Sequence, residues 1–480
     1  MFTPARVRLL FVTCTVLFMA MLDNLVLGVA LPSIQEDLGA SLSDLQWFMN
    51  AYTLAFAVLL IPFSVLGDSI GRKEVFLAGT AVFTIGSLLS GLSDSSIALI
   101  LSRALQGVGG AAVVPLSLTL VNAAFPPEKR AVALGMWSGI SGLGLSIGPL
   151  IGGLIMEGAP WQMIFYVNVP IGVIAFVLGL RWLQPSRGIR KPLDPIGVLL
   201  LTSGLLGIVF GLERGNADGW DSTTVMGSLA GGFILLVLFY LWERTRANPF
   251  IRFDLFRRKA YSFYVFAGFW MNAGVFGAIF LLTLFLQQAQ GNTPLGAGAR
   301  EMAWTTMTMI AAPLAGLAIN KFGNKNVLLI GLSMQAVALA LFAWIIGTQG
   351  ADVPFVNYLP AMMLAGTGMG LSFTPLSHGS LSSVPEDASG EASGMGNATR
   401  ELGGVFGIAI AGLIFQSGGD IRTPEQFADH IVPSLASSAI MMTVALIGVA
   451  LFVRNRSAAS AKAVVNAQPK APAQAAQDRA

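Results

Sequence analysis

Long apolar stretches recur along this chain, separated by short segments rich in turn residues and charges. Most of them are close to the ~20 residues that a helix needs to cross the hydrocarbon core of a bilayer. The fourteen stretches are residues 9–31, 45–66, 75–93, 97–121, 132–155, 162–182, 195–213, 224–242, 261–287, 297–319, 326–347, 355–376, 399–416 and 433–453. Only helices and closed β-barrels satisfy backbone polar groups in hydrocarbon, and these stretches lack the strict alternation of barrel strands. The pattern predicts an all-α membrane protein with fourteen transmembrane helices.

The composition supports lipid as the main solvent of this chain. Its 480 residues are 54% hydrophobic and only 11% charged, whereas soluble domains carry about 25% charged residues. Cys14 is the only cysteine and neither histidine has neighbours at metal-ligand spacing, so we expect no disulfide framework and no metal. The absence of a Gly-x-x-x-x-Gly-Lys-Ser/Thr loop disfavours an ATP-driven pump. No cluster of nucleophile, base or metal ligands is visible, so we do not expect an enzyme.

Lys and Arg are distributed unevenly between alternating loops. If the N-terminus is cytoplasmic, the inside segments carry 24 of the 28 basic residues and the outside loops carry only Arg214 and Arg422. Cytoplasmic loops are enriched in Lys and Arg. We therefore expect a multi-pass membrane protein with both termini in the cytoplasm. Because the basic residues are confined to particular loops, the net charge of +3 does not indicate nucleic-acid binding.

Two distant turns have related sequences, which indicates an internal repeat. Residues 64–73 follow the second apolar stretch, and residues 316–325 follow the tenth. The aligned pairs are Asp68 with Asn320, Gly71 with Gly323, and Lys73 with Lys325. The most basic loop, 243–260, lies between the two copies. Related halves in parallel orientation are a recurring transporter architecture, with the binding site at their interface near the membrane midplane.

The first of these turns contains Asp68, Gly71, Arg72 and Lys73. Asp68, at a helix end, can pair with Arg72 or with a neighbouring helix end, and Gly71 permits a tight reversal of the chain. The segment is thus a candidate cytoplasmic clasp between helices. The alternative is a basic loop that only sets membrane orientation.

The fifth stretch carries a run of small residues, Gly144, Gly148, Pro149, Gly152 and Gly153. Small residues four apart let helix backbones approach closely, and the proline removes one backbone hydrogen bond and bends the helix. Ordinary helix packing is the alternative to a specific function for this face.

Charged residues also occur within the apolar stretches, where they are rare and default to a functional hypothesis. Asp23, followed by Asn24, lies about two-thirds of the way along the first stretch. We expect its carboxylate to bind a proton or a cationic substrate. It could instead be a buried acid satisfied by a hydroxyl group or by Arg103. Arg103, followed by Gln106, lies in the fourth stretch, and we expect it to act in coupling or gating, or as a purely structural partner.

Two further pairs combine an arginine with a glutamate. Arg300 and Glu301 are expected one to two turns inside the helix at 297–319. Glu301 is either a second titratable group near the outer mouth or part of a salt bridge at the interface. Arg400 and Glu401 lie at the start of the stretch 399–416 and are expected to be interfacial anchors.

These motifs resemble those of one family of transporters. The turn at Asp68–Lys73 resembles the signature loop of the major facilitator superfamily, and Arg103–Gly107 resembles its Arg-x-x-Gln-Gly motif. Residues 144–153 resemble the antiporter motif of its drug exporters, and residues 22–32 and 161–172 resemble motifs of the fourteen-helix drug:proton antiporters (EmrB/QacA-like multidrug exporters). The resemblance implies two six-helix bundles, 1–184 and 259–455, two inserted helices with a basic loop at 185–258, and a disordered cytoplasmic tail at 456–480.

The resemblance also implies a location, a bacterial plasma (inner) membrane, and a function. It predicts a secondary active transporter that exports lipophilic, in some cases cationic, drugs or antibiotics in exchange for protons. The proton gradient would be the energy source, so no cofactor is expected. The expected partners are a drug-like small molecule, protons and the lipid bilayer, with the protein as a monomer. The alternative is a proton-coupled or facilitative transporter of a metabolite or of a self-made natural product.

Overall fold

The computed structural model describes residues 3–186, 194–246, 249, 251–385, 388–419 and 421–453. The side chains of Asn24, Asn320 and residues 127–132, 134, 135, 138, 142, 145, 146, 216, 217, 389 and 390 lie outside this description. The predicted tail at 456–480 lies outside it as well. The described residues form helices joined by short turns, without strands.

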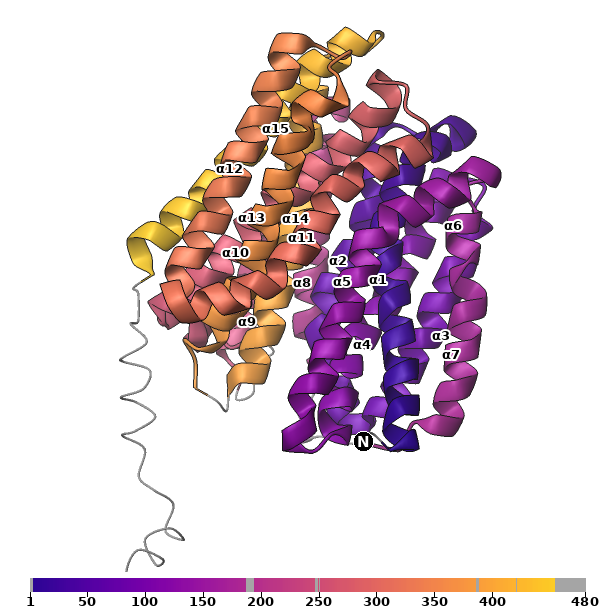
Figure 1. Cartoon of the computed structure of the whole chain (residues 1–480), viewed down its shortest axis with the longest axis vertical. Helices are drawn as coiled ribbons and strands as arrows, with labels where there is room; N and C mark the ends of the chain where they lie inside the picture. Colours follow the sequence, from indigo (N-terminus) through magenta and orange to yellow (C-terminus); the bar gives the residue numbers. More distant parts are fainter. Residues whose placement is uncertain are drawn as a thin grey trace, which may run out of the picture.

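The helices follow one another along the chain with little intervening structure (Figure 1). Their bounds are α1 Pro4–Leu38, α2 Leu42–Ile70, α3 Arg72–Gly91, α4 Ser96–Ala124, α5 Pro127–Gly158, α6 Met163–Tyr166, α7 Asn168–Trp182, α8 Pro195–Asp218, α9 Thr223–Arg244, η1 Phe253–Arg257, α10 Lys259–Leu284, η2 Phe285–Ala289, α11 Pro294–Phe322, α12 Asn324–Gln349, α13 Phe355–Leu381, α14 Ser389–Gln416 and α15 Pro424–Phe452.

Within the described residues, twelve helical spans are long and apolar enough to cross a membrane. Here α6 and α7 together form one span, and η2 continues α10 as a π-helical turn. Two more long helices, α5 with 32 residues and α13 with 27, bring the number to fourteen. The predicted helical membrane fold is confirmed.

Most helices are longer than the apolar stretches that predicted them, because their first and last turns include polar residues. Proline occupies the first turn of α1, α5, α8, α11 and α15, where its missing N–H costs no hydrogen bond. Two expectations about helix ends were wrong. Arg72 and Lys73 form the first turn of α3 rather than a loop. Arg400 and Glu401 are the twelfth and thirteenth residues of α14, not an anchor at its start.

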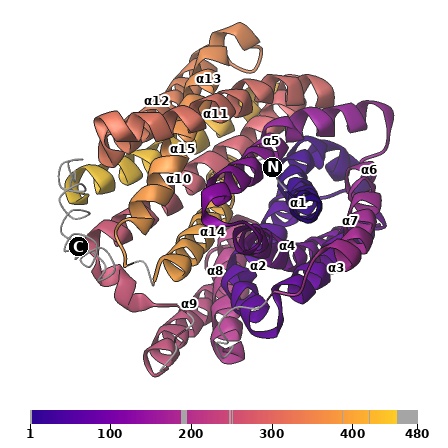
Figure 2. The ribbon, with the colours of Figure 1, turned by 60° about the horizontal axis from the view of Figure 1, so that its bottom comes forward.

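The helices form two bundles and a separate pair (Figures 1 and 2). Helices α1 to α7 lie together on one side, and α10 to α15 lie together on the other. The pair α8 and α9 lies at the edge of the molecule (Figure 2). A small apolar cluster joins α8 to α2 and α14, and it contains Leu54, Val58, Leu205, Val209 and Val405.

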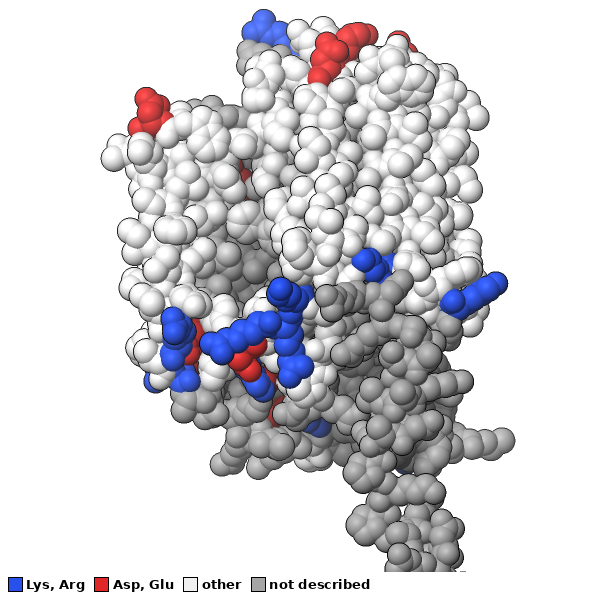
Figure 3. All heavy atoms as spheres, turned by 90° about the vertical axis from the view of Figure 1, so that its left-hand side faces the viewer, with Lys and Arg blue, Asp and Glu red and all other residues white. Residues whose placement is uncertain are grey.

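The surface carries the signature of a membrane protein. Figure 3 shows a broad uncharged band, with Lys and Arg gathered toward its lower edge. Large apolar side chains such as Leu101, Leu199 and Leu317 are two-thirds exposed, as expected where lipid replaces water. The cytoplasmic orientation of the termini stays a prediction.

Candidate transport site

A buried ion pair lies inside the first bundle. Asp23 is the twentieth residue of α1, and Arg103 lies in the first half of α4. Arg103 Nη1 donates to Asp23 Oδ2 at 2.5 Å and to Gln106 Oε1 at 2.6 Å, and Arg103 Nε donates to the Phe48 carbonyl on α2 at 3.1 Å. Asp23 is 4% exposed and Arg103 is 1% exposed. One ion pair therefore connects α1 with α4, and its arginine also reaches α2.

The second carboxylate oxygen of Asp23 is held by amides. Gln106 Nε2 donates to Asp23 Oδ1 at 2.8 Å, and Asn168 Nδ2 donates to the same oxygen at 3.0 Å. Both amides also donate to Ser87 Oγ on α3, which donates to the Phe165 carbonyl at 3.0 Å. Charge-assisted hydrogen bonds of this kind are the strong ones. Helices α1, α4 and α7 thus meet at one carboxylate, and Ser87 of α3 contacts both of the amides that hold it.

Three members of this site were not among the predicted residues. Asn168 lies in the segment 161–172, which the sequence singled out as a motif without assigning a role to the amide. Ser87 carries no signal in the sequence, because serine is common in membrane helices. Tyr52 of α2 places its ring 4.6 Å from Arg103 Cζ, in a cation–π contact that only the packing reveals.

Asp23 was predicted either to bind a proton or a cation, or to be a buried acid paired with Arg103. The carboxylate points into the bundle, as expected, and it is satisfied by Arg103. Among the described residues, its hydrogen-bond partners all belong to the first bundle, and the side chain is buried. A cation would have to displace Arg103 to bind there. The side chain of Asn24, the neighbouring predicted site residue, lies outside the described residues.

The side chains of Glu301 and Arg300 contact different neighbours. Glu301 of α11 is 6% exposed and accepts a hydrogen bond from Thr283 Oγ1 of α10 at 2.5 Å. Arg300 instead donates to the Gly296 carbonyl at 3.2 Å and places its guanidinium 5.5 Å from the Phe355 ring. In the described part of the chain, Glu301 contacts Thr283 and not Arg300, so these contacts do not give the alternative of a salt bridge at the interface. Glu301 as a titratable group stays a prediction.

The glycine run of α5 packs against helices of both halves. A Cβ added at Gly144 or Gly148 would lie 3.0 to 3.1 Å from atoms of Met21, Phe18 or Leu25 on α1. A Cβ at Gly153 would lie 2.6 Å from Leu295 Cα on α11. On α11, a Cβ at Gly298 would overlap the Pro149 carbonyl oxygen. Small residues thus let α5 approach α1 closely on one side and α11 on the other.

The junction of α2 and α3 contains the predicted ion pair and the predicted glycine. Arg72 Nε donates to Asp68 Oδ1 at 2.8 Å, and Gly71 has a φ of 151°, which favours glycine. The Arg72 amide donates to the Ser186 carbonyl at 2.7 Å, which connects the turn to the segment after α7. The role of this turn as a clasp during transport stays a prediction.

A second charged cluster lies outside the membrane-spanning segments, where η1 meets α14. Arg252 forms ion pairs with Asp254 at 2.8 Å and with Glu391 at 3.3 Å. The hydrogen bonds from Arg252 hold the pKa of the Asp254 carboxyl below its ordinary value. This cluster attaches the basic loop to the beginning of α14.

Known proteins share both the sequence pattern and the fold. Residues 13–408 match the family model of the Major Facilitator Superfamily. The tetracenomycin C resistance and export protein of Streptomyces glaucescens is 34% identical over 418 residues, which are 86% of this chain and 77% of that protein. The multidrug resistance protein Stp of Mycobacterium tuberculosis (strain CDC 1551 / Oshkosh) is 34% identical over 83% of this chain and 74% of its own length.

A solved structure shows the same arrangement of helices at low sequence identity. A POT family transporter in complex with 5-aminolevulinic acid superposes with a TM-score of 0.70 at 13% identity, over 93% of this chain and 96% of that one. The match to the family model covers most of the chain, and the relatives are similar over most of their length. This chain belongs to the Major Facilitator Superfamily.

Proposed function

We propose that this protein exports lipophilic small molecules from the cell in exchange for protons. The observation that carries the proposal is the buried Asp23–Arg103 pair, because an ionisable pair inside a membrane bundle is costly and marks proton or ion pathways. The relatives support export as the direction, since they are named for drug resistance and for antibiotic export.

The geometry suggests how a proton could control the first bundle. A proton on Asp23 would cancel the charge that Arg103 faces, and this would weaken contacts that join α1, α4 and α7. Loss of the proton would restore them. Each charge that crosses 100 mV contributes ~2.3 kcal/mol, roughly a fiftyfold concentration bias. Asp23 would thus couple the proton gradient to the packing of one half.

Transport into everted membrane vesicles tests this proposal. A panel of fluorescent dyes and antibiotics is offered to vesicles energised with an inside-acid gradient, with and without an uncoupler. We expect uptake of some panel members that the uncoupler abolishes and that Asp23→Asn loses. Asp352→Asn is the matched control, because Asp352 is exposed in the turn between α12 and α13. Uptake that persists in Asp23→Asn or ignores the uncoupler would defeat the exchange mechanism.

A narrower function, export of one natural product, is supported by a specific observation. One relative is named for tetracenomycin C alone, whereas another is named for multidrug resistance. The same vesicle panel separates the two functions. A single transported compound class indicates a dedicated exporter, and many unrelated classes indicate a multidrug exporter.

A further inference from the structure

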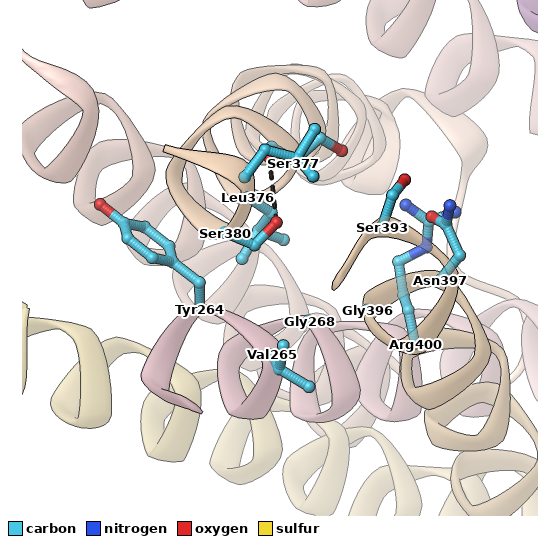
Figure 4. A pocket seen from close by; sticks show the side chains of 11 residues that line it. Tyr264, Val265, Gly268, Leu376, Ser377, Ser380, Ser393, Gly396, Asn397 and Arg400 are labelled. Carbon is cyan, nitrogen blue, oxygen red and sulfur yellow. Dashed lines mark hydrogen bonds between the residues drawn. The ribbon is translucent and has the colours of Figure 1, made fainter. Parts of the chain in front are cut away.

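A pocket in the second half does not include any of the predicted coupling residues (Figure 4). It encloses about 380 Å³ of empty space, which includes open solvent at its mouth. Its lining comes from α10, α13 and α14, namely Tyr264, Val265, Gly268, Leu376, Ser377, Ser380, Leu381, Ser393, Gly396, Asn397 and Arg400. It lies where α10 and α14 begin and α13 ends, on the side of the basic loop.

Among the described residues that line this pocket, Arg400 is the only charged one. Its side chain is 22% exposed, and its Nε is buried without an acceptor in the described part of the chain. Its Nη2 forms an ion pair with Glu401 Oε1 at 3.6 Å, a distance longer than that of a hydrogen bond. The guanidinium lies 5.0 Å from the Phe373 ring. A guanidinium has five donors, and the one on Nε is left without an acceptor among the described residues.

This contrasts with the arginine in the first half. Arg103 donates to a carboxylate, an amide and a backbone carbonyl, and its acidic partner is fully engaged. The acid beside Arg400 is Glu401, which forms an ion pair with it at the longer distance of 3.6 Å. The two arginines therefore differ in hydrogen bonding: Arg103 is held tightly by its acid, whereas Arg400 is held loosely and keeps an Nε without an acceptor in the described part of the chain.

Neutral polar groups accompany Arg400. Figure 4 shows Ser393 and Asn397 beside its guanidinium on α14, with Ser377 of α13 directed toward them. Glycine keeps the space between the helices open, because a Cβ at Gly268 would come only as near as 4.0 Å to Arg400. The rest of the lining is mainly apolar. The arrangement suits a negatively charged oxygen group attached to an apolar body.

We propose that this pocket binds the carboxylate or phenolate group of an exported organic anion. This inference rests on the proposed export function and names its substrate class. Arg400 makes the charge contact, and Ser393 and Asn397 donate hydrogen bonds to the same group. The enclosed space is small, so the apolar remainder of the molecule lies outside the pocket. The protein therefore prefers anionic to cationic compounds of similar size.

An anionic lipid headgroup shares this chemistry, but the position of the pocket favours a transported molecule. Gly394, next to Ser393, faces the first half, since a Cβ there would lie 3.3 Å from Ile61 of α2. The pocket is thus adjacent to the junction of the two halves, where a transported molecule would pass.

Binding of two matched dyes to the purified full chain tests the proposal. The probes are fluorescein, an anionic xanthene, and rhodamine 6G, a cationic xanthene ester, measured by fluorescence anisotropy in phosphatidylcholine nanodiscs. We expect fluorescein to bind more tightly than rhodamine 6G. Arg400→Gln should weaken fluorescein binding about tenfold, since a hydrogen-bonded charge contact is lost. Arg400→Lys should weaken it less, and Arg246→Gln, which alters an exposed arginine on Trp242, should leave it unchanged.

Each contrary result has a defined meaning. Equal binding of the two dyes, or unchanged fluorescein binding in Arg400→Gln, overturns the proposal. If nanodiscs with phosphatidylglycerol abolish fluorescein binding to the natural chain, the pocket takes a lipid headgroup and the proposal also fails. Uncoupler-sensitive transport of rhodamine 6G by Arg400→Gln would show that the variant is folded. A complete lack of uncoupler-sensitive transport in every variant would instead count against the export function.

Discussion

Lys73 and Lys325 make equivalent contacts in the two halves of the protein. Lys73 Nζ donates to the Leu180 carbonyl at 3.0 Å, near the end of α7. Lys325 Nζ donates to the Ala450 carbonyl at 2.7 Å, near the end of α15. Each lysine follows a glycine with positive φ, Gly71 or Gly323. The aligned turns therefore connect the third helix of each half to the last helix of the same half.

Removal of either lysine should loosen only its own half. In Lys73→Met, the end of α7 loses a charge-assisted cap, because lysine stabilises the last carbonyls of a helix. We expect faster amide hydrogen exchange near Leu180 and unchanged exchange near Ala450. Lys325→Met should give the reverse pattern. Exchange measured by mass spectrometry checks this, and equal effects at both sites would contradict two independent turns.

The Asp23–Arg103 pair should show strong coupling in stability. Asp23→Asn or Arg103→Gln alone leaves one buried charge uncompensated, at a cost of about 3–5 kcal/mol. The double variant removes both charges and should recover much of the thermal stability, although it should not recover proton-driven transport. Thermal unfolding of the purified protein measures the cycle. Additive losses in the double variant would show that the two side chains do not depend on each other.

The contact between α5 and α11 should be sensitive to volume at Gly298. A side chain there would overlap the Pro149 carbonyl, so Gly298→Val should force the two helices apart. We expect a loss of about 1–3 kcal/mol in stability, together with proton leak into proteoliposomes. Gly316→Ala, in the same helix with open space around it, is the control. If proteoliposomes with Gly298→Val leaked no more protons than those with the natural protein, the close contact between α5 and α11 would not be what blocks protons.

Glu213 links the helix pair α8 and α9 to the first bundle through a hydrogen bond. It lies on α8 at 2% exposure and accepts a hydrogen bond from Asn50 Nδ2 on α2 at 2.6 Å. Glu213→Ala would leave the buried Asn50 amide unpaired and should cost about 1–3 kcal/mol. Glu213→Gln keeps an acceptor and should lose much less. Thermal unfolding compares the two, with Asp218→Ala at the exposed end of α8 as control.

The helices and their order could be predicted from the sequence because each apolar stretch must satisfy its backbone hydrogen bonds locally in lipid. Helix ends were predicted less well. Arg400 was expected at an interface, but α14 begins eleven residues earlier at Ser389. The polar segment 389–398 gave no apolar signal, although helical hydrogen bonds continue through it.

The sequence by itself determined which ionisable residues enter the membrane. Asp23, Arg103 and Glu301 stand out there because charge is rare among apolar residues. Only the tertiary structure decided their partners. Asp23 meets Arg103 across 80 positions and Asn168 across 145, whereas adjacent Arg300 and Glu301 turn to different neighbours. The hydrophobicity of a segment determines whether that segment enters the membrane. The partner of a buried charge depends on which helix packs against it, and only the assembled bundle shows this.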